Sequence, residues 1–107
     1  MRPCLDGILS TLYSETLVEE LAVLEHDRWA HWQRYLHSKC EAHEDGSLSI
    51  PAELVQRWTE QVESAYADLT EEEKNSDREQ VRRYLPTIAA ALVNYSQIDS
   101  MGRQDPV

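Results

Sequence analysis

The chain has 107 residues, of which 41% are hydrophobic and 28% are charged, a composition typical of one globular domain. Its formal net charge at neutral pH is −10. Affinity for long nucleic acid and for anionic membrane surfaces comes mainly from clustered Lys and Arg, so this charge argues against both partners. It still permits one small anionic ligand in a locally basic pocket.

The N-terminus and the cysteines indicate the compartment. Residues 1–7 lack the apolar segment and cleavage site of a secretory signal, and no apolar run is long enough to span a membrane, so we expect a cytoplasmic protein. Cys4 and Cys40 are the only cysteines, and their spacing does not match a metal site. We therefore expect two free thiols, no bound metal and no cofactor.

The first half of the chain predicts two helices. Apolar residues recur at helical spacing over residues 5–13, which indicates a short amphipathic helix with Asp6 near its start. A long helix should follow over residues 15–40, where Thr16 and Glu19 have the spacing of a capping box. One broad arc of this helix is apolar: Leu17, Val18, Leu21, Ala22, Leu24, Trp29, Trp32, Tyr35 and Leu36.

Two charged residues, Glu25 and Arg28, fall on the same apolar arc. Burying a carboxylate and a guanidinium costs free energy unless both groups are paired and hydrogen-bonded. As i, i+3 neighbours they can pair with each other, or they can line a cavity together with charges from another helix. The sequence leaves both interpretations open.

The middle of the chain predicts a loop and a further helix. Residues 41–47 are polar and contain a glycine, which is typical of an exposed loop, and residues 48–50 alternate as a short extended segment does. Pro51 suits the first turn of a helix that should run to about Ser64. Trp58 lies among aliphatic residues on one face of that helix, so we expect it to anchor the core.

The last helix should span residues 71–95. Thr70 and Glu73 form the clearest capping box in the chain, and further glutamates at the helix start favour it electrostatically. Pro86 should kink or interrupt the helix because it cannot donate a backbone hydrogen bond. The inward stripe is Val81, Tyr84, Leu85, Ile88, Leu92 and Tyr95, and its backward extension brings Lys74, Asp77 and Arg78 to the same side.

These patterns predict a mainly α fold: one compact helical domain of three or four helices with one short extended segment. We expect a short N-terminal helix within residues 1–14, the helical domain over residues 15–95 and a flexible tail over residues 96–107. Both long helices carry charged residues on faces that otherwise predict burial. We therefore expect these charges to meet.

Two runs resemble the RyR domain, a small module first described as a repeat in ryanodine receptors and also found in bacterial and phage proteins. The first run is His26-Asp27-Arg28-Trp29-Ala30, which is similar to the family's H-x-x-W-A helix. The second extends from Tyr66 to Arg82 and is similar to the pattern P-Y-x-x-L-x-x-x-E-K-x-x-D-R-x-x-V-R. The resemblance covers roughly residues 15–90. The chain has Ala65 where the family has proline, and it lacks the family's Gly-Trp-x-Tyr-Gly segment after the first helix.

The resemblance implies a non-enzymatic module that binds a nucleotide-derived small molecule of the cyclic nucleotide or ADP-ribose type. Such a module would act as a sensor, or in a phage as a sponge that sequesters an immune messenger in the host cytoplasm. Aromatic rings would stack on a base, basic side chains would meet phosphate, and carboxylates would accept hydrogen bonds from ribose or hold the basic residues. The expected ligand-binding residues are Glu25, His26, Arg28, Trp29, Trp32, Tyr66, Lys74, Asp77, Arg78 and Arg82.

Other interpretations stay open beside this one. The tryptophans can fill the core while the charged residues form exposed pairs along one helix. The Trp-rich helical face can also serve a protein partner or a homodimer. Glu25 and Asp77 can form a carboxylate pair, but we expect no enzyme, because the sequence has no nucleophile motif or phosphate-binding glycine loop. The histidines of the long helix lack the i, i+3 or i, i+4 spacing of a metal pair.

Overall fold

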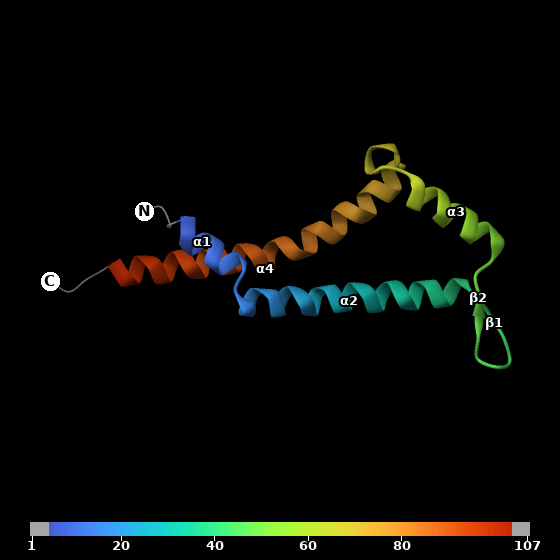
Figure 1. Cartoon of the computed structure of the whole chain (residues 1–107), viewed down its shortest axis with the longest axis horizontal. Helices are drawn as coiled ribbons and strands as arrows, with labels where there is room; N and C mark the ends of the chain where they lie inside the picture. Colours follow the sequence, from blue (N-terminus) through green and yellow to red (C-terminus); the bar gives the residue numbers. More distant parts are fainter. Residues whose placement is uncertain (1–4, 104–107) are drawn as a thin grey trace. The chain divides into compact units, whose positions relative to one another are not determined.

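A computed structural model describes the backbone of residues 5–103 and the side chains of residues 5–95 (Figure 1). Within these residues it contains four α-helices, one short 3-10 helix and one pair of short strands, which confirms the mainly α class. In chain order the elements are α1 (Leu5–Leu12), α2 (Glu15–Lys39), β1 (Glu41–Ala42), β2 (Leu48–Ser49), α3 (Ala52–Glu63), η1 (Tyr66–Asp68) and α4 (Glu71–Arg103).

The described chain forms two compact units, and both long helices contribute to each. The first unit contains α1, the part of α2 up to His26 and the part of α4 from Gln80 onward. The second unit contains the remainder of α2 from Asp27, the strand pair, α3, η1 and the start of α4 up to Glu79. Each unit has its own local contacts, which are described separately below.

In the first unit, Ser14 caps the start of α2. The Leu17 backbone N–H donates to Ser14 Oγ over 3.2 Å, and the Ser14 hydroxyl donates to the Thr11 carbonyl over 2.8 Å. The expected capping box at Thr16 is wrong, because α2 already begins at Glu15 and Thr16 lies inside its first turn. Leu17, whose backbone N–H makes this capping bond, is buried with 2% of its surface exposed.

Gly7 allows α1 to approach α4 closely in the same unit. A Cβ atom at this position would overlap Oη and Cζ of Tyr95. Real Cβ atoms do not come this close to other heavy atoms, so any larger residue here would require the Tyr95 side chain to move. Gly7 therefore makes the packing of α1 on α4 possible despite its poor helix propensity.

In the second unit, residues 41–49 form a β-hairpin, whereas the sequence predicted a loop before the extended segment. Strands β1 and β2 pair antiparallel, with Glu41 opposite Ser49. Gly46 has φ 88°, a conformation that L-residues with a Cβ rarely adopt. Asp45 Oδ1 accepts hydrogen bonds from the Ser47 hydroxyl (2.6 Å) and backbone N–H (2.9 Å), and these bonds lower the pKa of the Asp45 carboxyl.

The capping box at the start of α4 is confirmed. The Glu73 backbone N–H donates to Thr70 Oγ1 over 3.1 Å, and the Thr70 backbone N–H donates to Glu73 Oε1 over 3.0 Å. Both bonds satisfy backbone donors that the first helical turn leaves without intrahelical partners. This local signal identified the start of α4 correctly.

Two expectations for the remainder of α4 are corrected. Pro86 was expected to kink or interrupt the helix; interruption is wrong, because α4 runs through Pro86, and the kink stays a prediction. Proline removes one intrahelical hydrogen bond to the Arg82 carbonyl, and since Arg82 is exposed, water can take the place of that donor. The helix also continues to Arg103, so residues 97–103 do not form the expected irregular tail. Gly102 lowers helix propensity by only about 1 kcal/mol and does not end the helix.

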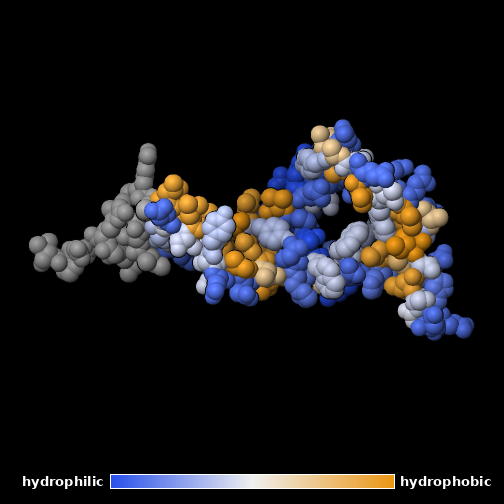
Figure 2. Space-filling model, in the orientation of Figure 1, coloured by the Kyte–Doolittle hydropathy of each residue, from blue (hydrophilic) through white to orange (hydrophobic). Residues whose placement is uncertain are grey.

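Cys40 is a free thiol, as expected, and Cys4 lies outside the described residues. None of the helices in the described part of the chain has the length and apolarity required to cross a membrane. Hydrophobic side chains instead lie at the surface of both units (Figure 2).

We expect Gly7→Ala to lower the free energy of unfolding by about 1–3 kcal/mol, because the added methyl group collides with the Tyr95 ring. In an unobstructed helix the same change would raise stability by about 1 kcal/mol. Urea denaturation followed by circular dichroism measures the difference. Ser10→Ala, at an exposed position of the same helix, is the matched control and should be close to neutral. An increase in stability for Gly7→Ala would contradict this packing.

Candidate functional site

A cavity of about 450 Å³ opens in the second unit, between the end of α2, α3, the η1 turn and the start of α4. This volume lies in the lower part of the range that ligand pockets occupy, about 300–1,000 Å³. Figure 2 shows the opening between α3 and the start of α4. The lining residues are Trp32, Trp58, Gln61, Val62, Ser64, Tyr66, Leu69 and Asp77.

Local structure places these side chains around the opening. On α3, Trp58, Gln61 and Val62 are i, i+3 and i+4 neighbours and therefore share one helical face. The short turn η1 follows, and the Leu69 backbone N–H closes it by donating to the Tyr66 carbonyl over 3.1 Å. Asp77 extends from α4, and α2 contributes Trp32.

Trp32 and Trp58 form the aromatic wall of the cavity. Their ring centroids are 5.7 Å apart with an interplanar angle of 62°, an edge-to-face arrangement that aromatic pairs prefer. Trp32 also contacts Tyr35, with centroids 5.5 Å apart and an angle of 30°. Trp58 is half-buried, so it does not act as the fully buried anchor that its aliphatic neighbours suggested.

Trp58 is the main site residue that sequence reasoning missed. Its helical spacing with Leu54, Val55 and Val62 predicts a core position. Only the approach of Trp32, from a helix distant in the sequence, makes Trp58 part of an open wall. No local pattern carries that information, and the same holds for Gln61, Ser64 and Leu69.

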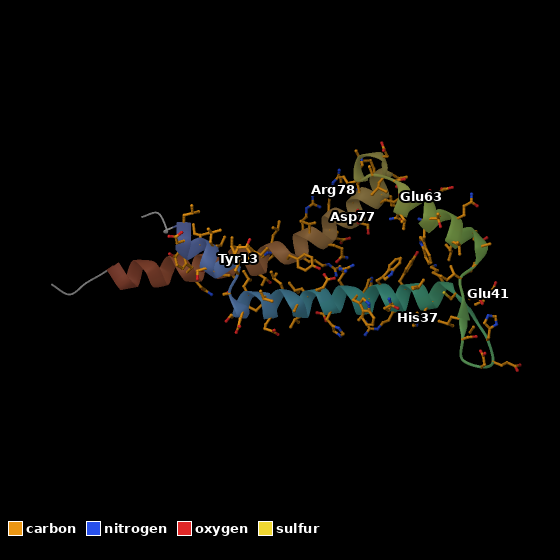
Figure 3. The ribbon with its side chains drawn as sticks, viewed as in Figure 1. Tyr13, His37, Glu41, Glu63, Asp77 and Arg78 are labelled. Carbon is orange, nitrogen blue, oxygen red and sulfur yellow. The ribbon has the colours of Figure 1, made fainter. Side chains whose placement is uncertain are left out.

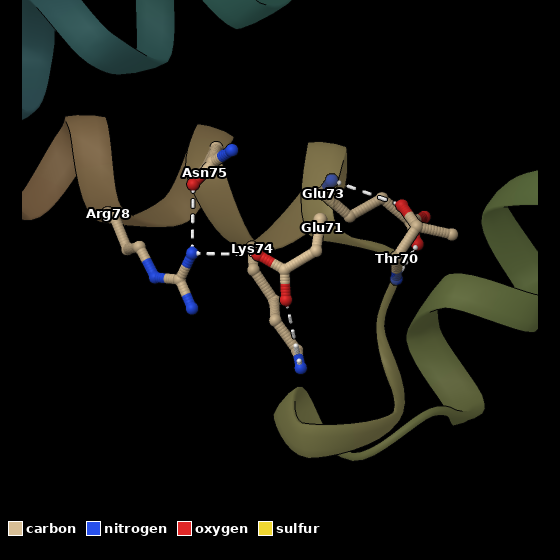
Figure 4. A network of polar contacts seen from close by, with 6 residues as sticks. All are labelled: Thr70, Glu71, Glu73, Lys74, Asn75 and Arg78. Carbon is tan, nitrogen blue, oxygen red and sulfur yellow. Dashed lines mark hydrogen bonds and ion pairs between the residues drawn. The ribbon is translucent and has the colours of Figure 1, made fainter.

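A cluster of polar contacts lies at the start of α4, beside the cavity (Figure 4). Arg78 Nη1 donates to Glu71 Oε2 over 3.2 Å and to Asn75 Oδ1 over 2.8 Å. Lys74 Nζ lies 3.7 Å from Glu71 Oε1. The hydrogen bond with Glu71 is the main cause that raises the pKa of Arg78 above its usual value. Glu71 thus pairs with both cations.

Tyr66 connects this cluster to the cavity. Its ring lines the opening, while Lys74 Nζ and Arg78 Cζ each lie 5.9 Å from the ring centroid. These distances fall within the range of cation–π attraction, about 6 Å. The basic residues that were expected to meet phosphate therefore do not line the cavity, but they are held at one of the rings that does.

Asp77 and Arg78 point to different sides of α4, which corrects the expectation that they share one face (Figure 3). Asp77 lines the cavity, and Arg78 extends to the outer side and pairs with Glu71. Successive helical residues are 100° apart, so these two side chains leave α4 in different directions. The cavity lining therefore contains the carboxylate without the guanidinium.

The expected site residues are divided between the two units. In the second unit, Arg28 and Trp29 lie on α2 shortly before Trp32, and Trp29 is 53% exposed, but neither is among the residues that line the cavity. The other expected site residues in the second unit are Trp32, Tyr66, Lys74, Asp77 and Arg78. The members in the first unit are Glu25, His26 and Arg82, all of which are exposed.

Glu25 has a structural partner within the first unit. The Tyr84 hydroxyl donates to Glu25 Oε2 over 2.5 Å, which links α4 to α2. A hydrogen bond to a charged acceptor is shorter and stronger than a neutral one. Because its side chain is exposed, Glu25 keeps much of its hydration. Its position on the apolar arc is thus explained by this contact.

The chain matches no known family model, and comparisons with curated proteins and with solved structures found no similar protein. Among the described residues, no three His, Cys, Asp or Glu side chains come together as metal ligands do. The geometry of the cavity is thus the main guide to function.

We expect the two tryptophans to be energetically coupled. In a double-mutant cycle of Trp32→Ala and Trp58→Ala, the two losses in unfolding free energy should differ from additivity by about 0.5–1.5 kcal/mol, as for other edge-to-face pairs. Equilibrium urea denaturation of the four proteins measures this coupling. Additivity within about 0.3 kcal/mol would show that the contact is absent in solution.

Proposed function

We propose that the second unit is a non-enzymatic binding module, and that its cavity takes the base of a nucleotide-derived small molecule such as a cyclic nucleotide or an ADP-ribose derivative. One observation carries the proposal: three aromatic rings, those of Trp32, Trp58 and Tyr66, border a single open cavity. Stacking of a base on an aromatic side chain contributes about 1–3 kcal/mol and needs only a flat ring on the ligand.

Polar groups at the same opening suit the edges of a nucleoside. Asp77 accepts hydrogen bonds from ribose hydroxyls or from an exocyclic amine. The amide of Gln61 and the hydroxyl of Ser64 can both donate and accept. An aromatic wall with a few polar groups at its border is the usual composition of small-molecule sites.

The phosphate of such a ligand would meet Lys74 and Arg78 at the Tyr66 ring. Both cations are held by Glu71, whose side chain is 74% exposed and therefore free to move into solvent. A phosphate then takes the place of the Glu71 carboxylate and offers the same oxygen geometry to the guanidinium fork. The charged cluster thus functions as a preformed anion site with a removable internal anion.

The cavity lining supports binding without catalysis. Asp77 is the only carboxylate among the described residues that line it, while acid–base hydrolysis of a glycosidic bond uses two carboxylates. Glu25, the other candidate, belongs to the first unit and bonds to Tyr84. We therefore propose a sensor or, in a phage, a sponge for a signalling nucleotide in the cytoplasm. The resemblance of residues 66–82 to the RyR domain agrees with this role, because several of them gather at the cavity.

Ligand binding should raise the melting temperature of the protein. A nucleotide at a hundredfold excess over its Kd adds about 2.7 kcal/mol to the free energy of unfolding. We expect a thermal-shift screen of cyclic nucleotides and ADP-ribose derivatives to identify such a ligand. Trp58→Ala should abolish the shift, because it removes one aromatic wall, and Lys74→Ala and Arg78→Ala should each reduce it.

Lys39 offers a matched control for Lys74. Its Nζ lies 5.6 Å from the Tyr35 ring centroid, so Lys39→Ala removes a similar cation–π contact away from the cavity lining. It should leave the ligand-induced shift unchanged. If no nucleotide raises the melting temperature, or if Lys39→Ala and Lys74→Ala weaken binding equally, the proposed site is wrong.

A second candidate function is self-association, which an exposed apolar ridge in the first unit favours. Val81, Leu85, Ala89 and Val93 follow each other at i+4 steps along α4, and all are exposed. The exposed fractions of Val81, Leu85 and Val93 are 57%, 52% and 54%. Among the described residues only Leu17 is buried. A second copy of the chain, related by a two-fold axis, would cover the ridge with an identical ridge.

Salt dependence and one substitution test this dimer. Because each chain carries a net charge of −10, screening should strengthen an apolar self-association, so the dimer fraction in sedimentation experiments should rise with salt. Leu85→Glu should reduce the dimer fraction at least about tenfold, since it places a carboxylate in the apolar contact. Val23→Glu, at an exposed position of α2, is the control. A monomer at all salt concentrations would exclude self-association.

A further inference from the structure

The charge of the cavity lining restricts the ligand further. Among the described residues that line it, Asp77 is the only one with a charged side chain. The others are aromatic, aliphatic or, in Gln61 and Ser64, polar and neutral. A carboxylate beside aromatic and aliphatic side chains attracts a cation and disfavours an anion. The net charge of −10 adds to this preference.

The aromatic walls favour a positive charge as well. The rings of Trp32 and Trp58 meet at 62°, so they form two adjoining walls rather than a parallel pair. The face of an aromatic ring carries a negative electrostatic potential, and tryptophan attracts cations most strongly. Tyr66 already interacts with two cations in this way, at 5.9 Å from Lys74 Nζ and from Arg78 Cζ.

The positive and negative groups around the cavity are separated in space. Asp77 faces the opening, whereas Arg78 extends to the outer side of α4 and is held by Glu71 (Figure 3). A ligand that matches this arrangement is positive where it enters the cavity and negative where it meets the Lys74 and Arg78 pair. A nucleotide with an uncharged base has a negative phosphate for the Lys74 and Arg78 pair. Its base, however, leaves the Asp77 charge without a counterion.

We propose that the base bound in this cavity carries a positive charge, as an N-alkylated purine or a nicotinamide-type pyridinium ring does. The positive ring lies against Trp32 and Trp58 with Asp77 as its counterion, and the phosphate lies at Lys74 and Arg78. This inference rests on the proposed nucleotide binding and names the chemical class of the ligand. On this proposal, the cavity distinguishes nucleotides by the charge of the base.

Two pairs of probes test the effect of ring charge; the purine pair keeps an aromatic ring in both members, whereas reduction of the nicotinamide ring removes its aromaticity together with its charge. One pair is 7-methylguanosine monophosphate and guanosine monophosphate, and the other is nicotinamide mononucleotide and its reduced form. The members of each pair share phosphate and ribose and differ chiefly in the charge of the ring. By isothermal titration calorimetry, we expect the cationic member of each pair to bind at least about tenfold more tightly, as cation–π and ion-pair contributions of usual size imply.

Substitutions at Asp77 test the source of this preference. Asp77→Asn keeps the shape of the side chain and removes its charge, so the preference should fall to about threefold or less, the part that the aromatic rings supply. Asp77→Glu keeps the charge and should retain the preference. Because Asp77 is exposed, both variants should fold, which circular dichroism and the melting temperature verify.

The outcomes separate this inference from the proposed function. If the four probes bind with similar affinity, or if the neutral members bind more tightly, the cavity is a nucleotide site that does not select for charge, and the inference is wrong. If the preference survives undiminished in Asp77→Asn, its assignment to this carboxylate is wrong. If none of the four probes binds, the inference is wrong, and the thermal-shift screen of cyclic nucleotides and ADP-ribose derivatives decides the proposed function separately.

Discussion

The contact between Trp32 and Trp58 is the interaction on which the candidate site depends. The two rings come from helices that are far apart in the sequence, and their edge-to-face approach at 5.7 Å connects α2 to α3 within the second unit. With this connection, one face of α3 and the η1 turn border an opening instead of a closed core. The same two rings therefore pack against each other and border the cavity, so a change in either should affect both stability and the proposed binding.

A shortage of buried surface is the second constraint on this protein. Leu17 is the only buried side chain among the described residues, while large apolar side chains such as Tyr13 and Val62 are exposed by 81% and 83%. Hydrophobic burial is the main favourable contribution to folding, so a chain with little of it gains much from any ligand or second copy that covers apolar surface. Binding and stability are therefore expected to be closely coupled here.

Predictions from local sequence patterns were correct where the interactions join residues close together in the chain. The capping box of Thr70 and Glu73 joins residues within one helical turn, and both of its hydrogen bonds are present. The hairpin before α3 was only partly predicted, because β1 has no pattern of its own and exists through pairing with β2. The predicted end of α4 was wrong, since polar composition near a chain end does not stop a helix when no proline or cap intervenes. Predicting that Asp77 and Arg78 share a face was also wrong, because a broad helical stripe does not distinguish adjacent residues.

The sequence by itself determined the helical class, the start of the last helix and the presence of aromatic and charged residues in two runs, since periodicity and capping depend on neighbours in the chain. Only the tertiary structure decided which of these residues meet. It placed Trp58 opposite Trp32, brought the Tyr84 hydroxyl to Glu25, and left Asp77 as the single charge among the described residues that line the cavity. Such contacts join positions distant in the chain, and they depend on how helices pack against each other. No pattern along one helix contains that information.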